Sequence, residues 1–325
     1  MPIRWSYALN QWRNGHDRFV LRSDHETAFK TVSISGFDAV ELEAGSGRWE
    51  PLGREDWIEL HYGSVRGLRD SMSSCALQGA SSYVFDPANP IFEEGAFGRS
   101  VLNADDHVAI ARTAEQYCRL LPRLGGDTLV VRALPTYAAT KMTAPEAVSF
   151  AAECWNKVGA IAASHGVRLA LNVDCLSVLR TIEDVGLLLE QCDPDTVGLS
   201  IDTADAVIAD IDPTELFERF ASRTWHVQIK NTRFVDELEE YKLPNPEKTM
   251  IGGGGKREIE RWYWELGDEK GLVDIQRFYS ALVENDFDGW IVVDSEQSPV
   301  PATSTMLNGW YVNNTLHAHT ADRAA

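Results

Sequence analysis

Basic residues are scarce in this 325-residue chain, and the shortage excludes several kinds of partner. Thirty lysines and arginines stand against 49 aspartates and glutamates, so the formal net charge is −19. Nucleic acids and anionic membrane surfaces are bound by clustered Lys and Arg, and we expect neither as a partner. The sequence also lacks a run of about 18 apolar residues, so no segment is expected to span a membrane. Its first residues lack the continuous apolar stretch of a signal peptide, which predicts a cytoplasmic protein.

Cysteine motifs and nucleotide-binding glycine motifs are absent as well. The five cysteines are odd in number and form no CxxC or Cys/His spacing. A disulfide framework or a structural zinc site is therefore not expected, and buried thiols are the simpler interpretation. No apolar segment is followed by GxGxxG, and the glycine run at 252–255 lacks the Ser or Thr of a phosphate loop. We interpret this run as a turn or a lid.

What the sequence does have is a regular alternation of short apolar segments with longer amphipathic ones. Apolar residues make up 44% and charged residues 24%, which is typical of a folded domain. The short segments are nearly continuous in apolar character, as in parallel strands that are buried on both faces. We predict eight strands, at residues 5–9, 37–43, 80–86, 128–134, 167–174, 196–202, 224–230 and 289–294.

Eight strand–helix units in this length predict a single α/β domain over residues 1–325, a (β/α)8 TIM barrel. Two long loops, 86–103 and 231–272, follow the third and seventh strands. Residues 295–325 form a C-terminal extension, which we expect to pack as a closing segment with Trp310 and Tyr311 in the core. Both loops lie at the C-terminal face of such a barrel, where barrel enzymes place their active sites.

Polar residues gather at the carboxyl ends of the predicted strands. Several are carboxylates, which repel one another at a common barrel mouth and need a cation, a shared proton or a basic neighbour. Lys230, Arg132 or a bound metal ion could supply the positive charge that offsets this repulsion. The residues at these strand ends are Asn10, Glu41, Glu43, Asp86, Arg132, Asn172, Asp174, Asp202, Asp205, His226, Gln228, Lys230, Asp294 and Glu296.

Four of these strand ends carry motifs that resemble a known family. The segments LALNVD (169–174), GLSIDTADAVIADIDP (198–213), HVQIKN (226–231) and DGWIVVDSEQSP (288–299) are similar to the xylose-isomerase-like barrel superfamily. That superfamily includes sugar phosphate isomerases, ketose 3-epimerases and inosose dehydratases. The stretch 264–299 is the most specific and resembles the ending of an inosose dehydratase. The resemblance covers nearly the whole chain and implies a xylose-isomerase-like TIM barrel.

The resemblance also implies a divalent metal site, built in the family from a Glu, an Asp, a His and a second Glu on the last four strands. Matching motif by motif places Asn172, Asp202, Gln228 and Asp294 at these positions, and only Asp202 is unchanged. An all-oxygen ligand set of this kind suits a hard divalent cation, Mn²⁺, Mg²⁺ or Ca²⁺. The alternative is that the metal is lost and the carboxylates act alone. The sequence leaves both open.

The chemistry implied by the resemblance is proton abstraction next to a carbonyl, followed by reprotonation or elimination. It needs a base and an electrophile that stabilises the enolate. We predict that the catalytic residues are Asp174, His226, Lys230 and Asp294, although Lys230 has a structural alternative as a partner of nearby acids. The predicted substrate-binding residues are Asn10, Glu43, Arg132, Asp205, Glu296 and Trp264. Trp264 belongs to an aromatic group, 262–264, that would stack on a sugar or an aromatic aglycone, with burial against a partner subunit or closure of the lid as alternatives. Arg132 has the alternative of bridging acids.

Within this class, the altered ligand set and the aromatic loop resemble enzymes that cleave oxidised glycosides, such as the large subunit of C-glycoside deglycosidases. We therefore expect a lyase that acts on a 3-oxo-glycoside, with a small sugar or glycoside as its ligand. A small β-rich subunit or a second copy of the chain is the expected protein partner. Two alternatives stay open: a ketose isomerase, epimerase or inosose-type dehydratase, and a non-catalytic sugar-binding or partner barrel.

Overall fold

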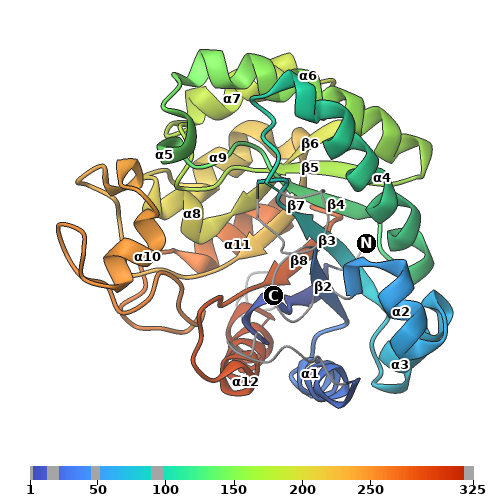
Figure 1. Cartoon of the computed structure of the whole chain (residues 1–325). Coiled ribbons are helices and arrows are strands. Elements are labelled where there is room, and N and C mark those ends of the chain that lie inside the picture. The colour runs from blue at the N-terminus through green and yellow to red at the C-terminus, as the bar shows by residue number, and fades with distance from the viewer. Residues whose placement is uncertain (1–2, 13–21, 45–51, 89–97, 318–325) are drawn as a thin grey trace.

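The computed structural model describes residues 3–12, 22–44, 52–88 and 98–317, and its centre is a closed barrel of eight parallel strands (Figure 1). Each strand pairs with the next one in sequence, and β8 closes the barrel onto β1. This confirms the predicted (β/α)8 fold. The strands are β1 (Arg4–Ala8), β2 (Ala39–Ala44), β3 (Ala80–Phe85), β4 (Thr128–Arg132), β5 (Arg168–Asn172), β6 (Val197–Asp202), β7 (Thr224–Ile229) and β8 (Trp290–Val293).

Helices surround the barrel and cover the outer faces of its strands (Figure 1). Capping residues at the helix ends determine where the helices begin and end. The Glu146 carboxylate accepts a hydrogen bond from the Thr143 backbone N–H at the start of α6, and α4 ends at Gly125, whose φ of 99° suits glycine. The helices are α1 (Arg22–Ile34), α2 (Glu55–Tyr62), α3 (Val65–Ser74), α4 (His107–Leu124), α5 (Tyr137–Thr140), α6 (Ala144–Ser164), α7 (Ile182–Gln191), α8 (Thr203–Ile208), α9 (Pro213–Phe220), α10 (Pro246–Ile251), α11 (Ile275–Glu284) and α12 (Pro301–Tyr311).

The strands are apolar on both faces because one face fills the barrel and the other packs under helices. All six residues of β6 are buried. Gly198 of β6 leaves room for the Trp225 ring of β7, since a Cβ at Gly198 would lie 2.3 Å from that ring. The eight predicted strands each match an observed one, and their ends differ by at most two residues. Burial on both faces is what made these segments continuous in the sequence.

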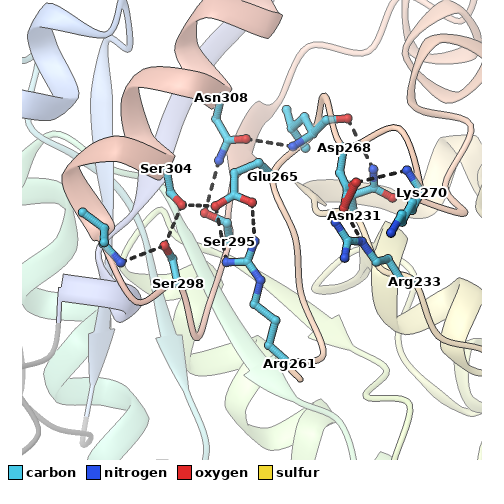
Figure 2. A network of polar contacts seen from close by, with 12 residues as sticks. Asn231, Arg233, Arg261, Glu265, Asp268, Lys270, Ser295, Ser298, Ser304 and Asn308 are labelled. Carbon is cyan, nitrogen blue, oxygen red and sulfur yellow. Dashed lines mark hydrogen bonds and ion pairs between the residues drawn. The ribbon is translucent and has the colours of Figure 1, made fainter. Parts of the chain in front are cut away.

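The second predicted loop, 231–272, is an ordered segment held against α12 by polar side chains (Figure 2). Arg261 forms an ion pair with Glu265, whose carboxylate also accepts a hydrogen bond from the Ser304 hydroxyl of α12. The Asn308 Oδ1 atom of α12 accepts the Leu266 backbone N–H at 2.8 Å. These contacts tie the loop to the C-terminal helix. We call the following residues the loop clasp: Arg261, Glu265, Ser298, Ser304 and Asn308.

The described part of the C-terminal extension packs on the outside of the barrel through a face that the sequence did not indicate. Residues 301–311 form α12, which packs against α1. Gly309 allows the close approach, because a Cβ there would lie 2.1 Å from the Ser35 carbonyl oxygen. The prediction that Trp310 belongs to the core is wrong: it is 63% exposed, and Tyr311 is half-buried. The buried face of α12 is made of small and polar residues, so its aromatic residue points outward.

Other predictions concern the remaining parts of the chain. All five cysteines are buried and unpaired, which confirms their interpretation as core thiols. No helix in the described ranges has the length and apolar character needed to cross a bilayer. Residues 89–97 of the first predicted loop and residues 318–325 of the extension lie outside the described residues.

Candidate active site

A cavity of about 360 Å³ opens at the carboxyl ends of the barrel strands. This is the face where barrel enzymes place their active sites, and the volume is at the lower end of the range for small-molecule pockets. Residues at or just beyond every strand contribute to its wall, and so does the 231–272 segment. Most of the predicted site residues line it: Asn10, Glu43, Arg132, Asn172, Asp174, Asp202, Asp205, Gln228, Lys230 and Glu296.

The Lys230 ammonium group occupies the centre of the acidic part of this cavity. Lys230 follows β7, and its Nζ lies 3.0 Å from Asp202 Oδ2 at the end of β6 and 2.7 Å from Asp294 Oδ2 just after β8. Glu296 Oε2 is 3.7 Å from the same nitrogen, and the ring of Tyr263 lies 4.4 Å from it. The lysine therefore joins three consecutive strand ends.

The charge of Lys230 follows from these neighbours. Burial by itself would lower the pKa of the ammonium group, but the negative charges of Asp202, Asp294 and Glu296 outweigh burial. The pKa of Lys230 is therefore raised well above its ordinary value. The side chain is an ammonium donor at neutral pH, and it neutralises part of the carboxylate repulsion that the sequence predicted for the barrel mouth.

The four predicted metal ligands do not fit a metal ion in this arrangement. Asp202 uses Oδ1 to accept the backbone N–H groups of Ala204 and Asp205 at 3.0 and 3.1 Å, as the N-cap of α8, and its Oδ2 faces Lys230. Asp294 Oδ2 accepts from Lys230 and from Asn10 Nδ2, the latter at 2.9 Å.

Gln228, the third of these residues, donates its Nε2 to Glu41 on the opposite side of the barrel. Asn172, the fourth, lines the cavity. Among the described residues, no cluster of three or more His, Cys, Asp or Glu side chains is arranged as a metal site. The cation at the centre of the predicted set is Lys230.

A second cation, Arg132 at the end of β4, holds the opposite side of the cavity. Its guanidinium contacts Asp86 Oδ2 at 3.1 Å and Asp174 Oδ2 at 2.7 Å. Asp174 Oδ1 is also occupied, because it accepts the Leu176 backbone N–H at 2.7 Å. The predicted base Asp174 is thus engaged on both oxygens. Arg132 bridges two acids from neighbouring strand ends, which is the alternative role that the sequence left open.

Two predicted catalytic residues lie below or behind the cavity lining. His226 is fully buried on β7, where Nε2 lies 2.9 Å from Glu41 Oε2 and Nδ1 lies 2.9 Å from Ser200 Oγ. Asp294 is also fully buried, behind Lys230. Neither is among the side chains that line the cavity. Direct contact with a ligand in the cavity does not fit these positions, and the catalytic role of His226 and Asp294 stays a prediction.

Glu41 and its partners form a buried polar floor under the cavity. The Glu41 carboxylate accepts hydrogen bonds from Ser82 Oγ at 2.7 Å and from Gln228 Nε2. Burial by itself would raise its pKa, but the charge of His226 and the hydrogen bonds from His226, Ser82 and Gln228 outweigh burial. The pKa of Glu41 is therefore lowered, and the floor fixes the orientation of Gln228.

The pKa of Asp205 is shifted in the direction opposite to that of Glu41. It lines the cavity on α8 and accepts a hydrogen bond from the Tyr263 hydroxyl at 2.9 Å. Burial raises its pKa, and the neighbouring charges of Asp202 and Asp174 raise it further. The pKa of Asp205 is well above its ordinary value. The cavity therefore combines an ammonium group with a carboxyl group that tends to keep its proton.

The position of Trp264 does not fit its predicted role as a substrate-binding residue. Its backbone pairs with that of Asn231, and its ring lies between the guanidinium groups of Arg233 and Arg261, at 3.1 and 3.9 Å. Trp264 is not among the side chains that line the cavity, whereas its neighbours Trp262 and Tyr263 are. The aromatic segment does reach the cavity, but through the two preceding residues.

Glu247 is a cavity residue that the sequence did not reveal. It lies on α10 within the 231–272 segment, and Gln297 Nε2 donates to its carboxylate. Burial raises the pKa of Glu247, and the charge of Asp174 adds to the rise. The acidic character of the second long loop was the only signal in the sequence.

Several buried polar atoms around the cavity lack a hydrogen-bond partner within the part of the chain that the structure describes. They are Asn10 Oδ1, Arg132 Nε and Asp294 Oδ1. Leaving such groups unpaired costs about 1–3 kcal/mol each. Asn10 and Arg132 line the cavity, where a water molecule or a polar ligand would supply the missing contacts.

A family model described as xylose isomerase-like TIM barrel matches residues 29–310. Among curated proteins, an inosose dehydratase of Geobacillus kaustophilus (strain HTA426) is 30% identical over 156 residues, 47% of this chain and 47% of that protein. An inosose dehydratase of Bacillus velezensis is 29% identical over 206 residues, 59% of this chain and 66% of that protein. The chain thus matches between about half and two thirds of the length of these relatives.

Solved structures show the same fold at low identity. The probable 3-DHS dehydratase AsbF of Bacillus anthracis superposes with a TM-score of 0.70 at 14% identity, covering 96% of this chain and 100% of that chain. The IOLI protein, whose structure is described with a binding zinc atom, superposes with a TM-score of 0.64 at 16% identity, covering 98% and 97%. These neighbours establish the architecture of the barrel.

Proposed function

The chain belongs to the xylose isomerase-like TIM barrel family, and from that premise we propose that it is an enzyme of oxo-sugar chemistry. The reaction is a β-elimination. A base takes a proton from the carbon next to a carbonyl, and the electron pair forms an enolate. An oxygen leaving group on the neighbouring carbon then departs with a proton from an acid. Two relatives with dehydratase names, an inosose dehydratase and a probable 3-DHS dehydratase, support elimination as the reaction type.

The observation that carries the proposal is the position of Lys230. Its Nζ is a cavity-lining ammonium group fixed between Asp202 and Asp294. An ammonium held in this way donates a hydrogen bond to a substrate carbonyl oxygen and stabilises the negative charge that develops on that oxygen. Since both flanking carboxylates are anchored to strand ends, the donor does not need to reorganise during the reaction.

Glu296 is the best-placed base among the cavity-lining residues. Its Oε2 lies 3.7 Å from Lys230 Nζ. The proton to be removed sits on the atom next to the carbonyl carbon, so a base near the carbonyl-binding donor is the one within reach. Asp174, predicted as a base, is engaged by Arg132 and by the Leu176 backbone. It is better suited to hold Arg132 against the substrate hydroxyl groups.

Asp205 is suited to the role of the acid. Its raised pKa favours the protonated form of the carboxyl group, and the Tyr263 hydroxyl donates a hydrogen bond to its Oδ1. A protonated carboxyl group delivers its proton to the departing oxygen as the bond to carbon breaks. The proposal thus assigns the base to Glu296 and the acid to Asp205, the two parts that an elimination requires.

The leaving group is either water or an alcohol. Loss of water corresponds to the reaction in the names of the relatives, and a monocyclic oxo-polyol suits a cavity of about 360 Å³. Loss of an alcohol corresponds to the 3-oxo-glycoside lyase that we predicted. That second candidate is favoured by Trp262 and Tyr263, whose rings line the cavity and offer an apolar surface to a flat aglycone.

The test is to incubate the protein in D₂O with an inosose and with 4-nitrophenyl 3-oxo-glucoside. NMR follows deuterium exchange next to the carbonyl, and absorbance follows the enone product or the released nitrophenol. We expect exchange and elimination with at least one substrate. E296Q is expected to lose exchange, whereas D205N is expected to keep exchange and lose elimination. The matched control is Glu190→Gln, which changes an exposed glutamate in the last turn of α7 that does not line the cavity.

The outcomes separate the alternatives. Exchange without elimination in the wild-type protein would indicate an epimerase or isomerase. Neither exchange nor elimination with a panel of oxo-sugars would overturn the proposal in favour of the non-catalytic sugar-binding barrel. Elimination with the glycoside alone would support the lyase.

A further inference from the structure

Three of the four positions that hold a divalent metal in the resembled family are engaged here by other residues of the chain: Asp202 and Asp294 by Lys230, and Gln228 by Glu41. The two carboxylates among them, Asp202 and Asp294, both have an oxygen directed at the same atom, Lys230 Nζ. The lysine backbone is fixed as well. Its N–H donates to Thr203 Oγ1 at 2.9 Å, and its carbonyl accepts from the same hydroxyl at 2.7 Å. The ammonium group is therefore positioned by the fold from both ends.

The distances suit an ammonium group and do not suit a metal ion. Carboxylate oxygens lie about 2.7–3.0 Å from an ammonium nitrogen in a charge-assisted hydrogen bond, which is what Asp202 and Asp294 show. Mn²⁺ and Mg²⁺ require oxygen atoms at about 2.0–2.2 Å. A metal at the same point would have to displace Lys230 and draw both carboxylates inward. Asp202 cannot move freely, because its other oxygen caps α8 through two backbone N–H groups.

We propose that Lys230 is the resident cation of this site and takes the place of the divalent metal, so that the protein binds no metal there and works without one. An ammonium group cannot be removed by a chelator, and it supplies one positive charge and a directed N–H donor where a metal would supply two charges and open coordination positions. The part that concerns catalysis rests on the proposed function. The part that concerns metal binding does not, and two measurements separate them.

The first measurement is Mn²⁺ binding, followed by the electron paramagnetic resonance of free Mn²⁺ during titration. We expect the dialysed wild-type protein to show no saturable site up to about 1 mM free Mn²⁺, the weak end of oxygen-ligand sites. Lys230→Met removes the ammonium group at nearly constant volume, and we expect it to gain one Mn²⁺ site with at least tenfold tighter binding (about tenfold per 1.4 kcal/mol). Lys242→Met, at an exposed lysine that pairs with Glu239, is the control and is expected to behave as wild type.

One equivalent of Mn²⁺ bound by the wild-type protein, and lost in Asp202→Asn, would overturn the proposal. A folded Lys230→Met protein that gains no Mn²⁺ site would overturn it too, because the lysine would then not occupy a cation position. Circular dichroism shows whether the Lys230→Met protein is folded. If it is not, the Mn²⁺ titration of the wild-type protein by itself tests the proposal.

The second measurement is the elimination rate of the wild-type protein, as purified, before and after treatment with a chelator. We expect the rate to stay within twofold and to show no increase with added Mn²⁺. A rate that falls at least tenfold and returns with Mn²⁺ would contradict the proposal. If no oxo-sugar is turned over at all, the proposed function fails while the Mn²⁺ titration still tests the resident cation.

Discussion

Two regions of this molecule use the same kinds of polar groups for different ends. The cavity and the loop clasp both pair cationic side chains with carboxylates and hydroxyl-bearing or amide side chains. In the clasp, no side-chain nitrogen or oxygen of the named residues is left buried without a partner in the described part of the chain. Around the cavity, three buried atoms have no hydrogen-bond partner within the described residues: Asn10 Oδ1, Arg132 Nε and Asp294 Oδ1. The clasp is a saturated network, which stabilises the fold, whereas the polar atoms around the cavity still need partners such as water or a polar ligand.

The two regions are also connected. The clasp fixes the segment 231–272 against α12 (Figure 2), and the same segment carries Glu247, Trp262 and Tyr263 into the cavity wall. The Trp262 backbone N–H donates to Gln297 Oε1 at 3.0 Å, just beyond β8. The clasp therefore supports the cavity without contacting it. The comparison predicts that changes in the cavity alter the reaction, and that changes in the clasp alter stability.

The largest expected effect comes from Lys230→Met. Turnover should fall about 10²- to 10³-fold, because a fixed donor to the developing oxyanion is lost. The protein should also lose several kcal/mol of stability, since Asp202 and Asp294 remain buried without their cation. The rate of elimination and the thermal midpoint measure the two effects. Turnover that stays near the wild-type level would remove Lys230 from the reaction and reduce the cavity to a structural network.

Asp205→Asn is expected to lower the rate of elimination while it raises thermal stability. Elimination should fall about 10²-fold because the acid is lost. The raised pKa of Asp205 means that the unfolded chain releases this proton at a lower pH than the folded protein does. The wild type is therefore fully stabilised below about pH 3.8 and loses stability as pH rises toward the folded pKa. Asn does not titrate, so the variant should gain thermal stability relative to wild type between pH 4 and pH 8.

Thermal melts of both proteins at pH 4 and pH 8 check the stability half of this prediction. A midpoint difference that does not change between the two pH values would show that Asp205 has no raised pKa. Asp210→Asn, at the exposed residue that follows α8, gives the matched control.

Arg132→Lys should have a smaller effect on the same cavity. The guanidinium contacts Asp86 and Asp174 at once, and an ammonium group cannot reproduce that fork. Loss of one charge-assisted hydrogen bond corresponds to about a tenfold fall in kcat/KM. Steady-state kinetics should show the change chiefly in KM if Arg132 holds the substrate, as we propose. A change confined to kcat would instead give Arg132 a part in proton transfer.

Much of the fold could be predicted because its signals are local. Strands buried on both faces leave continuous apolar segments in the sequence, and these segments located all eight strands to within two residues. The short helices α8 and α10 were missed, since six residues carry too little periodicity to be recognised. The outward position of Trp310 depended on the small residues that α12 buries, which is a property of packing and not of the aromatic residue itself.

The site could be predicted only as a set of residues. The rule that barrel sites gather at strand ends placed Lys230, Arg132 and Asp205 at the cavity. It could not show which acids surround which cation, because that depends on the stagger between β6, β7 and β8 and on side-chain directions. Trp264 illustrates the limit. In the segment 262–264, the backbone pairing with Asn231 decides which aromatic rings face the cavity, and this pairing leaves no mark in the sequence.

Glu265→Gln in the clasp is the smallest of these changes and the clearest contrast with the cavity. Burial would raise the pKa of Glu265, but the hydrogen bond from Ser304 and the contact with Arg261 outweigh burial, so the pKa is lowered. The ionised carboxylate therefore adds stability above about pH 4.5, and this contribution is lost as pH falls through the folded pKa. The variant should be less stable by about 1–2 kcal/mol at pH 7, the difference should be smaller at pH 3, and kcat should be unchanged. Thermal melts at the two pH values and steady-state kinetics at pH 7 test this. A clear fall in kcat of the folded variant would mean that the clasp is part of the site and that the two regions are not separable.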